Sequence, residues 1–170
     1  MGEKEKTIHE EHGESNSREG KYLSFSLGSE EYGIGIIKVK EIIGMIPVTP
    51  LPQTPEYVKG VINLRGKIIP VIDLRLRFGM NTIDYTDRTC IVVVEIDSNS
   101  GSRHIGIVVD SVSEVINIKG TDIEDTPSFG MTLSTQYILG IAKITGSVRV
   151  LLDIDRVLNA DELEMLDEVA

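Results

Sequence analysis

Parts of this chain repeat at fixed offsets, and the repeat limits the fold more than any other feature of the sequence. Residues 60–74 align without gaps on residues 140–154, and both copies keep two glycines, one aspartate and most apolar positions. A second block, residues 33–43, aligns on residues 106–116 in the same order along the chain. Two ordered matches arise by chance much more rarely than one, so they indicate duplication of a structural unit. The sequence therefore predicts two similar small barrels or curled sheets that pack together.

Composition indicates that the duplicated unit is built from strands. The chain has 23 Ile and 16 Val against 13 Leu and 3 Ala, and β-branched side chains suit a pleated sheet better than a helix. Apolar patterns bounded by turn residues predict strands over residues 21–27, 32–36, 61–64, 67–73, 89–96, 103–109, 137–145 and 148–153. We therefore expect an all-β, or mainly β, fold.

The chain divides into a tail and a body. Residues 1–19 are polar and acidic and are expected to form a disordered tail. The body, residues 20–156, consists of a first subdomain of about 20–85 and a second of about 86–156. The pattern leaves open whether the two subdomains exchange strands.

The C-terminal segment, residues 157–170, predicts an acidic helix. Leu163, Leu166 and Val169 recur at helical spacing. Asp161 is the expected N-cap, and Glu164 three residues later completes a capping box.

Charge and hydropathy exclude several classes of function. The net charge is −10, but residues 1–20 and 153–170 carry most of the excess acid, and the body between them is nearly neutral. Without a basic stripe, the chain lacks the attraction for phosphates that drives nucleic-acid binding. Its longest apolar runs, such as residues 90–94, are far shorter than the ~20 residues of a membrane helix. The N-terminus does not resemble a signal peptide, and the single cysteine fits a reducing cytoplasm.

The reactive side chains are not arranged for catalysis or metal binding. Two histidines lie in the tail, and His104 is expected to be an exposed strand residue. Cys90 begins an apolar run and is expected to pack as a small hydrophobic residue. Asp73 and Asp153 occupy equivalent repeat positions, where they are expected to cap the helical turns that follow. The acidic residues near Asp122 lack the spacing of a calcium-binding loop. Taken together, these side chains lead us to expect no catalytic activity, metal or cofactor.

Two surface residues are candidates for partner contacts. Arg65 stands in a tight turn between two apolar strands, where the repeat has Thr145, so duplication does not explain it. An arginine on a rigid hairpin can bind a partner carboxylate in a bidentate fashion, although it could also simply be solvated. Phe129 lies in a loop, where it could anchor an interface or fold back onto the core.

The same residues resemble a known family. The run from Lys59 to Arg75, KGVINLRGKIIPVIDLR, and the segments 106–112 and 133–140 resemble the CheW family of bacterial chemotaxis coupling proteins. The likeness covers about residues 20–168. It implies two SH3-like five-stranded β-barrels and a cytoplasmic scaffold without catalytic activity or small-molecule substrate. Such a scaffold links the cytoplasmic tips of methyl-accepting chemoreceptors to the regulatory domain of the histidine kinase CheA, and is recruited to membrane-associated receptor arrays.

The resemblance also implies where the partners bind. The receptor-binding residues would be Glu41, Ile42, Asn63, Leu64, Arg65 and Val115. The kinase-binding residues would be Thr89, Cys90 and Ile91, at a strand start expected to form an edge, with a second kinase contact near Phe129.

Two alternatives remain open at this point. The chain could be a detached regulatory domain of a CheA-type kinase, which has the same fold. It could also be a β-barrel that binds a small ligand, which predicts a closed pocket with converging polar groups. The scarcity of His, Cys and Trp in the body disfavours the second alternative.

Overall fold

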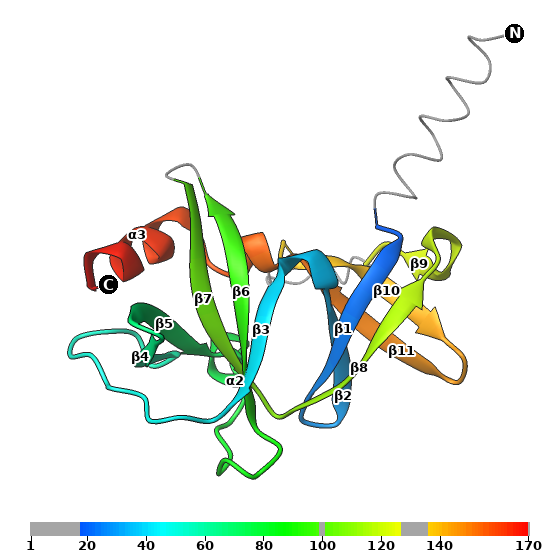
Figure 1. The fold of residues 1–170 in the computed structure, drawn as a ribbon. Coiled ribbons are helices and arrows are strands. Elements are labelled where there is room, and N and C mark those ends of the chain that lie inside the picture. Colours follow the sequence, from blue (N-terminus) through cyan, green and yellow to red (C-terminus); the bar gives the residue numbers. More distant parts are fainter. Residues whose placement is uncertain (1–17, 99–100, 127–135, 170) are drawn as a thin grey trace, which may run out of the picture.

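The computed structural model describes residues 18–98, 101–126 and 136–169, which form two sheets and a C-terminal helix (Figure 1). The strands are β1 (Gly20–Leu27), β2 (Glu30–Gly35), β3 (Val39–Gly44), β4 (Val58–Leu64), β5 (Lys67–Asp73), β6 (Cys90–Ser98), β7 (Gly101–Val109), β8 (Ser111–Ile118), β9 (Ile123–Glu124), β10 (Ile138–Ile144) and β11 (Ser147–Leu152). The helical segments are η1 (Ile36–Lys38), α2 (Leu74–Arg77), η2 (Gly120–Asp122), η3 (Ile154–Arg156) and α3 (Ala160–Val169). The predicted mainly β fold with a C-terminal helix is confirmed.

All the predicted strands are present, with their ends shifted by a few residues, but the sequence analysis missed β3, β8 and β9. Strands β3 and β8 are edge strands of their sheets. Each carries an exposed apolar side chain, with Ile42 43% and Val115 50% accessible. A strand with apolar side chains on a partly exposed face lacks the clear alternation by which half-buried strands are recognised.

Each sheet takes strands from both halves of the chain. The six-stranded sheet has the order β8-β1-β2-β11-β10-β9, and the five-stranded sheet has the order β3-β6-β7-β5-β4. The hairpin β1–β2 of the first half therefore lies among strands of the second half, and the hairpin β6–β7 lies among strands of the first. The question of strand exchange, which the sequence left open, is answered by this reciprocal arrangement.

The two junctions created by this exchange are equivalent. Strand β11 runs parallel to β2 with Leu151 opposite Gly33, and β5 runs parallel to β7 with Val71 opposite Gly106. Leu151 lies 80 residues after Val71, and Gly106 lies 73 residues after Gly33. The offsets found in the sequence thus relate the two places where the halves join.

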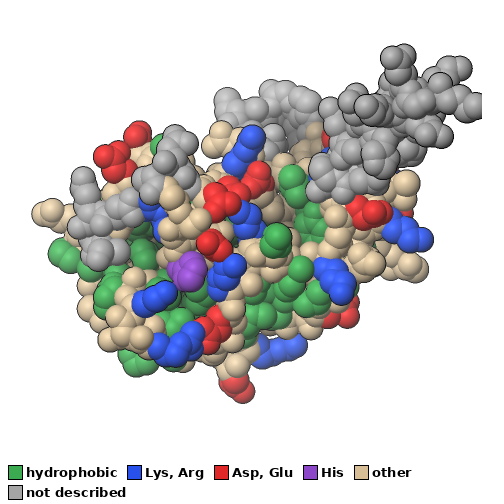
Figure 2. Space-filling view, turned by 45° about the horizontal axis from the view of Figure 1, so that its top comes forward, with side chains coloured by type: hydrophobic (Ala, Val, Ile, Leu, Met, Phe, Trp, Pro, Cys, Tyr) green, Lys and Arg blue, Asp and Glu red, His purple; other side chains and the backbone are tan. Residues whose placement is uncertain are grey.

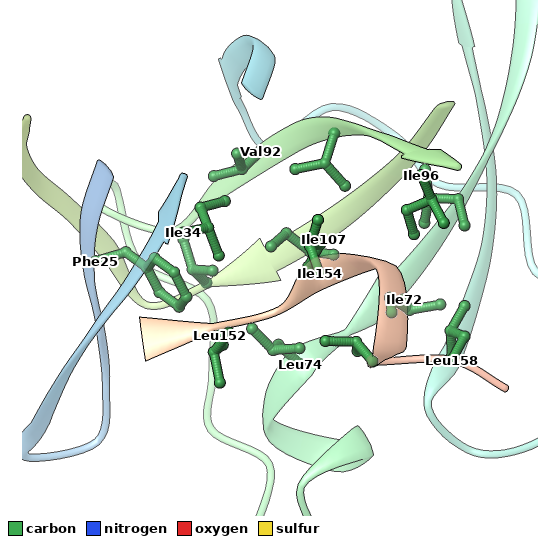
Figure 3. Packing of buried hydrophobic residues seen from close by; sticks show 14 of the residues in the cluster. Phe25, Ile34, Ile72, Leu74, Val92, Ile96, Ile107, Leu152, Ile154 and Leu158 are labelled. Atoms are coloured by element: carbon green, nitrogen blue, oxygen red, sulfur yellow. The ribbon is translucent and has the colours of Figure 1, made fainter. Parts of the chain in front are cut away.

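The largest apolar cluster is shared between the halves (Figure 3). Phe25 and Ile34 of the first hairpin meet Val92 and Ile107 of the second, and Leu163 and Leu166 bring α3 onto the same cluster. Side chains alternate along a strand, so the neighbours of Val92 in β6 belong to a separate cluster within the five-stranded sheet. A third, smaller cluster fills the six-stranded sheet. Burial of the shared cluster therefore holds the halves and α3 together.

One glycine of the repeat is required by a close crossing of the backbone. Gly60 lies at a register shift in β4 with φ 141°, beside the segment that leads from β3 to β4. Thr49 of that segment exchanges two backbone hydrogen bonds with Val61, each 2.9 Å long. A Cβ atom at residue 60 would lie 2.0 Å from the Thr49 carbonyl oxygen. The equivalent Gly140 is similarly crowded, since its Cβ would lie 3.0 Å from the Glu124 carbonyl oxygen.

An ion pair holds the tip of the exchanged β1–β2 hairpin in place. The Nε and Nη2 atoms of Arg75 each donate to a carboxylate oxygen of Asp110 at 2.8 Å. The backbone N–H of Gly28, at the hairpin tip, donates to the same carboxylate at 2.7 Å. Asp110 therefore connects the first hairpin to α2 and to the end of β7.

Lys38 forms ion pairs beside the other hairpin. The Nζ atom of Lys38 lies 3.1 Å from a carboxylate oxygen of Asp97 and 2.8 Å from one of Asp155. The backbone N–H of Asp97 donates to Asp155 at 3.0 Å. Asp155 is 80 residues after Arg75, so one repeat position carries a base in the first copy and an acid in the second. At the offset of 73, Lys38 corresponds to Ser111 rather than to Asp110, so the two ion pairs share only this one repeat position.

Two predicted boundaries need correction. The cap of α3 is Asn159, whose Oδ1 accepts from the Glu162 N–H at 2.8 Å, while Glu162 accepts from the Asn159 N–H at 2.9 Å. This capping box lies two residues before the predicted Asp161 and Glu164. The predicted tail also extends too far, because Arg18 donates to Asp125 at 2.8 Å and Glu19 accepts from the Gly120 N–H at 2.9 Å. Residues 1–17 lie outside the described residues.

Candidate functional site

The acidic residues at equivalent repeat positions have structural roles. Asp73 accepts a hydrogen bond from the Leu76 N–H at 3.3 Å, and Asp153 accepts one from the Asp155 N–H at 3.2 Å. The predicted capping is thus confirmed. In the part of the chain that the structure describes, no three His, Cys, Asp or Glu side chains form a group that could hold a metal ion. No helix in that part is both long and apolar enough to cross a membrane.

The turn between β4 and β5 presents Arg65 on a rigid support. The side-chain oxygen of Asn63 accepts a hydrogen bond from the Gly66 N–H at 2.8 Å. Arg65 and Gly66 have φ angles of 53° and 87°, as a tight hairpin turn requires. Asn63 therefore shapes the turn, and the side chain of Arg65 extends from it with 70% of its surface accessible.

Arg65 pairs with Glu41 of the edge strand β3. Its Nη1 atom donates to one carboxylate oxygen at 2.9 Å, and Nη2 donates to the other, so the contact is bidentate. These hydrogen bonds lower the pKa of Glu41 below its ordinary value. The pair is open to solvent, so it contributes little to stability. It offers a partner a fixed pair of opposite charges.

The exposed apolar candidates lie on edge strands of different sheets. Ile42 of β3 is opposite Val92, and Val115 of β8 is opposite Leu23. Side chains of directly paired residues lie on the same face of a sheet, and both Val92 and Leu23 belong to the shared cluster. Ile42 and Val115 are therefore on the faces that meet at the junction of the halves, and β3 and the β1–β8 pair flank that junction in Figure 1.

The structure thus brings only some of the predicted receptor-binding residues into contact. Glu41 and Arg65 bind each other, and Asn63 supports the turn. Leu64 is half-buried and packs against the apolar cluster of the five-stranded sheet. Val115 belongs to the other sheet.

The predicted kinase-binding residues are less accessible than the sequence suggests. Thr89 is 4% exposed, and its hydroxyl accepts a hydrogen bond from the Thr86 N–H at 2.9 Å. Ile91 is fully buried, and only Cys90 is partly exposed. The expectation of an edge at this strand start is wrong, because β6 lies between β3 and β7. Phe129 lies outside the described residues.

Among the exposed apolar residues that were not predicted from the sequence, two occupy equivalent positions of the repeat. Ile68 of β5 is 48% exposed, and Val148 of β11 is 53% exposed. They are 80 residues apart and occupy equivalent positions, as Ile42 and Val115 do at an offset of 73. The repeat alignment contains the signal for both pairs, because apolar side chains recur there, but it does not show that they are exposed.

The fold and the site define a class of protein: a duplicated β module with exchanged hairpins, whose accessible candidate residues lie at the β4–β5 turn and on the edge strands β3 and β8. Residues 21–162 match the CheW-like domain. The chain is 42% identical over 149 residues to the chemotaxis protein CheW of Klebsiella aerogenes, covering 88% of this chain and 87% of that protein. It is 35% identical over 142 residues to the CheW of Rhizobium meliloti, covering 84% and 89%.

A solved structure agrees with these sequence matches. The scaffolding protein TtCheW from Thermoanaerobacter tengcongensis superimposes with a TM-score of 0.77 at 38% identity, covering 87% of this chain and 98% of that one. The chain belongs to the CheW-like family, and the resemblance found in its sequence is confirmed.

Proposed function

We propose that this chain is a non-catalytic chemotaxis scaffold that couples methyl-accepting chemoreceptors to the histidine kinase CheA. Its membership of the CheW-like family and the names of its relatives support this role. The observation that carries the proposal is the Glu41–Arg65 pair, which joins a rigid turn to the edge strand β3 that also carries the exposed Ile42. Such a surface suits recognition of a partner rather than chemistry on a substrate.

The receptor contact is proposed for Glu41, Ile42, Asn63, Leu64, Arg65 and Val115. Ile42 and Val115 offer apolar area on the faces that meet at the junction of the halves, and a helical receptor tip has an apolar face that could cover it. Glu41 is opposite Val93, so Glu41 and Arg65 lie on the other face of β3 from Ile42, where they would contact polar groups of the partner and set the register of binding. The partner would thus bury apolar area while the charged pair provides specificity.

Substitution of Arg65 tests the receptor contact. We expect Arg65→Ala to weaken binding of a receptor-tip fragment at least tenfold in calorimetry, about 1.4 kcal/mol, while CheA binding is unchanged. Arg156→Ala is the matched control, because that side chain is also an exposed arginine in an ion pair, 68% accessible. Equal weakening by both variants, or unfolding of the Arg65 variant, would contradict the assignment.

The kinase contact is proposed around Thr89, Cys90 and Ile91, with Phe129 as a second contact. Thr89 and Ile91 are buried, so they would support the surface from below, and Cys90 would be the residue of the three that touches the kinase. We expect Cys90→Arg to weaken binding of the CheA regulatory domain at least tenfold and to leave receptor binding within twofold. Loss of both activities together with the circular-dichroism signal would show a folding defect and refute the assignment.

The proposed location follows from the proposed partners. A scaffold for these partners works in the cytoplasm and is recruited to membrane-associated receptor arrays. Individual contacts on the order of micromolar, about −8 kcal/mol, would allow signalling states to exchange. Several such contacts in one array would then keep the scaffold in place.

A further inference from the structure

A hollow of about 470 Å³ opens between β5 and β7, and none of the residues proposed above for the receptor and the kinase lines it. The parallel pairing of these strands begins only where Val71 meets Gly106. Before that point the two strands separate, and the hollow lies between their N-terminal parts. Its lining consists of Lys67, Ile68, Ile69, Pro70, Glu95, Ser102, Arg103, His104 and Leu166.

The equivalent place in the other sheet is filled by the chain's own polar side chains. There the parallel pairing of β11 with β2 begins at Val150 and Tyr32. Just before it, the Nε of Arg149 donates to the Ser24 hydroxyl at 3.1 Å, and that hydroxyl donates to Glu31 at 3.2 Å. The residue equivalent to Arg149, 80 positions earlier, is Ile69, so the hollow lacks this polar network.

The charge of the hollow is opposite to that of the whole protein. Lys67 and Arg103 bring positive side chains to it beside His104, with Arg103 already engaged by α3, whereas the chain carries a net charge of −10. Its one acidic lining residue, Glu95, is offset by Lys40, whose Nζ lies 2.7 Å from the carboxylate. Figure 2 shows Lys and Arg side chains near the histidine on this face, with Asp and Glu side chains among them. The hollow therefore attracts negative groups locally.

The walls of the hollow also present an apolar side chain, and a hydrogen bond to α3 holds one wall in place. Ile68 is 48% exposed beside Lys67. Arg103 donates to the Leu163 carbonyl at 2.9 Å, which holds α3 against the strand. A ligand would thus meet basic groups and an apolar side chain at positions fixed by the sheet and the helix.

We propose that this hollow binds an extended peptide segment of a partner protein, in which acidic side chains alternate with apolar ones. Alternate side chains of an extended peptide point to the same side, so one row of carboxylates would face Lys67 and His104. The apolar side chains of the other row would cover Ile68. An extended segment could lie alongside the two strands where they separate. The residues that line this site differ from those proposed for the receptor and the kinase, although Lys67 is paired with Leu64.

The test is a titration of the full, 15N-labelled chain with the peptide acetyl-Val-Glu-Val-Glu-Val-amide, followed by NMR. We expect shifts confined to the amides of residues 67–69 and 102–104. Lys67→Glu should raise the Kd at least tenfold, and Ile68→Ser should raise it several-fold. Lys21→Glu, which makes the same charge change at an exposed site in the other sheet, should leave the Kd within twofold.

Three outcomes would overturn the proposal. The first is a peptide response located elsewhere on the protein or absent at millimolar peptide. The second is equal weakening by Lys67→Glu and Lys21→Glu, which would mean that net charge alone governs binding. The third is the same shifts and the same Kd with free succinate, which would identify a site for small acids rather than for a peptide.

Discussion

Asp110 shows how a single residue acquires a role that its sequence context does not reveal. It follows a buried strand and lies 35 residues from Arg75, so no local pattern connects the two side chains. In the structure the side chain of Asp110 is 19% accessible and that of Arg75 is 12% accessible. Asp73 and Asp153 contrast with it, because each caps the turn that directly follows and could be predicted from neighbouring residues.

The environment of Asp110 predicts a pH-dependent stability. Burial alone would raise its pKa, but hydrogen bonds from Arg75 and the Gly28 N–H outweigh this and hold the pKa below its ordinary value. A lowered pKa in the folded state contributes stability above the unfolded-state pKa of about 3.9, and that contribution is lost as the pH falls through the folded value. We expect Asp110→Asn to lower the free energy of unfolding by about 2 kcal/mol at pH 7.

Urea denaturation at several pH values measures this effect. The difference between Asp110→Asn and the unchanged protein should shrink as the pH falls from about 5 to below 4. Asp125→Asn is the control, because its side chain is 91% accessible and its pair with Arg18 should matter little. A difference that stays constant from pH 7 to pH 3 would refute the role given to the Asp110 carboxylate.

At the level of elements, the hairpin β4–β5 has a turn that could be predicted from the sequence and a loop contact that could not. Its turn could be predicted, because Asn63 and Gly66 supply the turn geometry from within four residues. The four prolines of residues 47–55, which cannot donate ladder hydrogen bonds, likewise indicate a loop before β4. The contact of this loop with β4 could not be predicted, because the bridge between Thr49 and Val61 depends on how the loop folds back over the sheet.

That crossing predicts a strong effect of Gly60→Ala. The added Cβ would lie 2.0 Å from the Thr49 carbonyl oxygen, so the loop or the strand must move. We expect the free energy of unfolding to fall by about 3 kcal/mol or more, measured by urea denaturation. Gly44→Ala in β3 has open space around its Cβ and should change stability by less than about 0.5 kcal/mol. Similar small effects of both substitutions would show that the crossing is not tight in solution.

For the whole molecule, the exchange of hairpins makes the two halves interdependent. The first hairpin contributes Phe25 and Ile34 to the shared cluster, and the second contributes Val92 and Ile107. A half that is separated from its partner would expose this cluster and would lose the neighbours of its own hairpin. The division at about residue 85 therefore separates the repeats along the chain without separating two independent sheets.

This interdependence predicts the behaviour of fragments. We expect residues 20–85 and residues 86–170, produced separately, to lack cooperative thermal unfolding in circular dichroism. Mixing the two should restore a 1:1 complex with a single transition, visible by size-exclusion chromatography. A cooperative transition in either fragment alone would contradict the dependence inferred from the exchange.

The sequence by itself determined the features that depend on residues close together in the chain or on the comparison of its two repeats. The duplication, the β-rich composition, the Asn63–Gly66 turn and the caps at Asp73 and Asp153 are encoded within a few residues or by a repeated order. The family resemblance rests on the same local motifs.

Only the tertiary structure decided which strands are neighbours and which residues are accessible. Strand periodicity specifies which side chains share a face but not which strand lies alongside. For that reason the sequence could not show the exchange of hairpins, the burial of Thr89 and Ile91, or the pairing of Glu41 with Arg65. Each of these depends on contacts between residues far apart in the chain, whose geometry is set only when the two halves pack on their shared core.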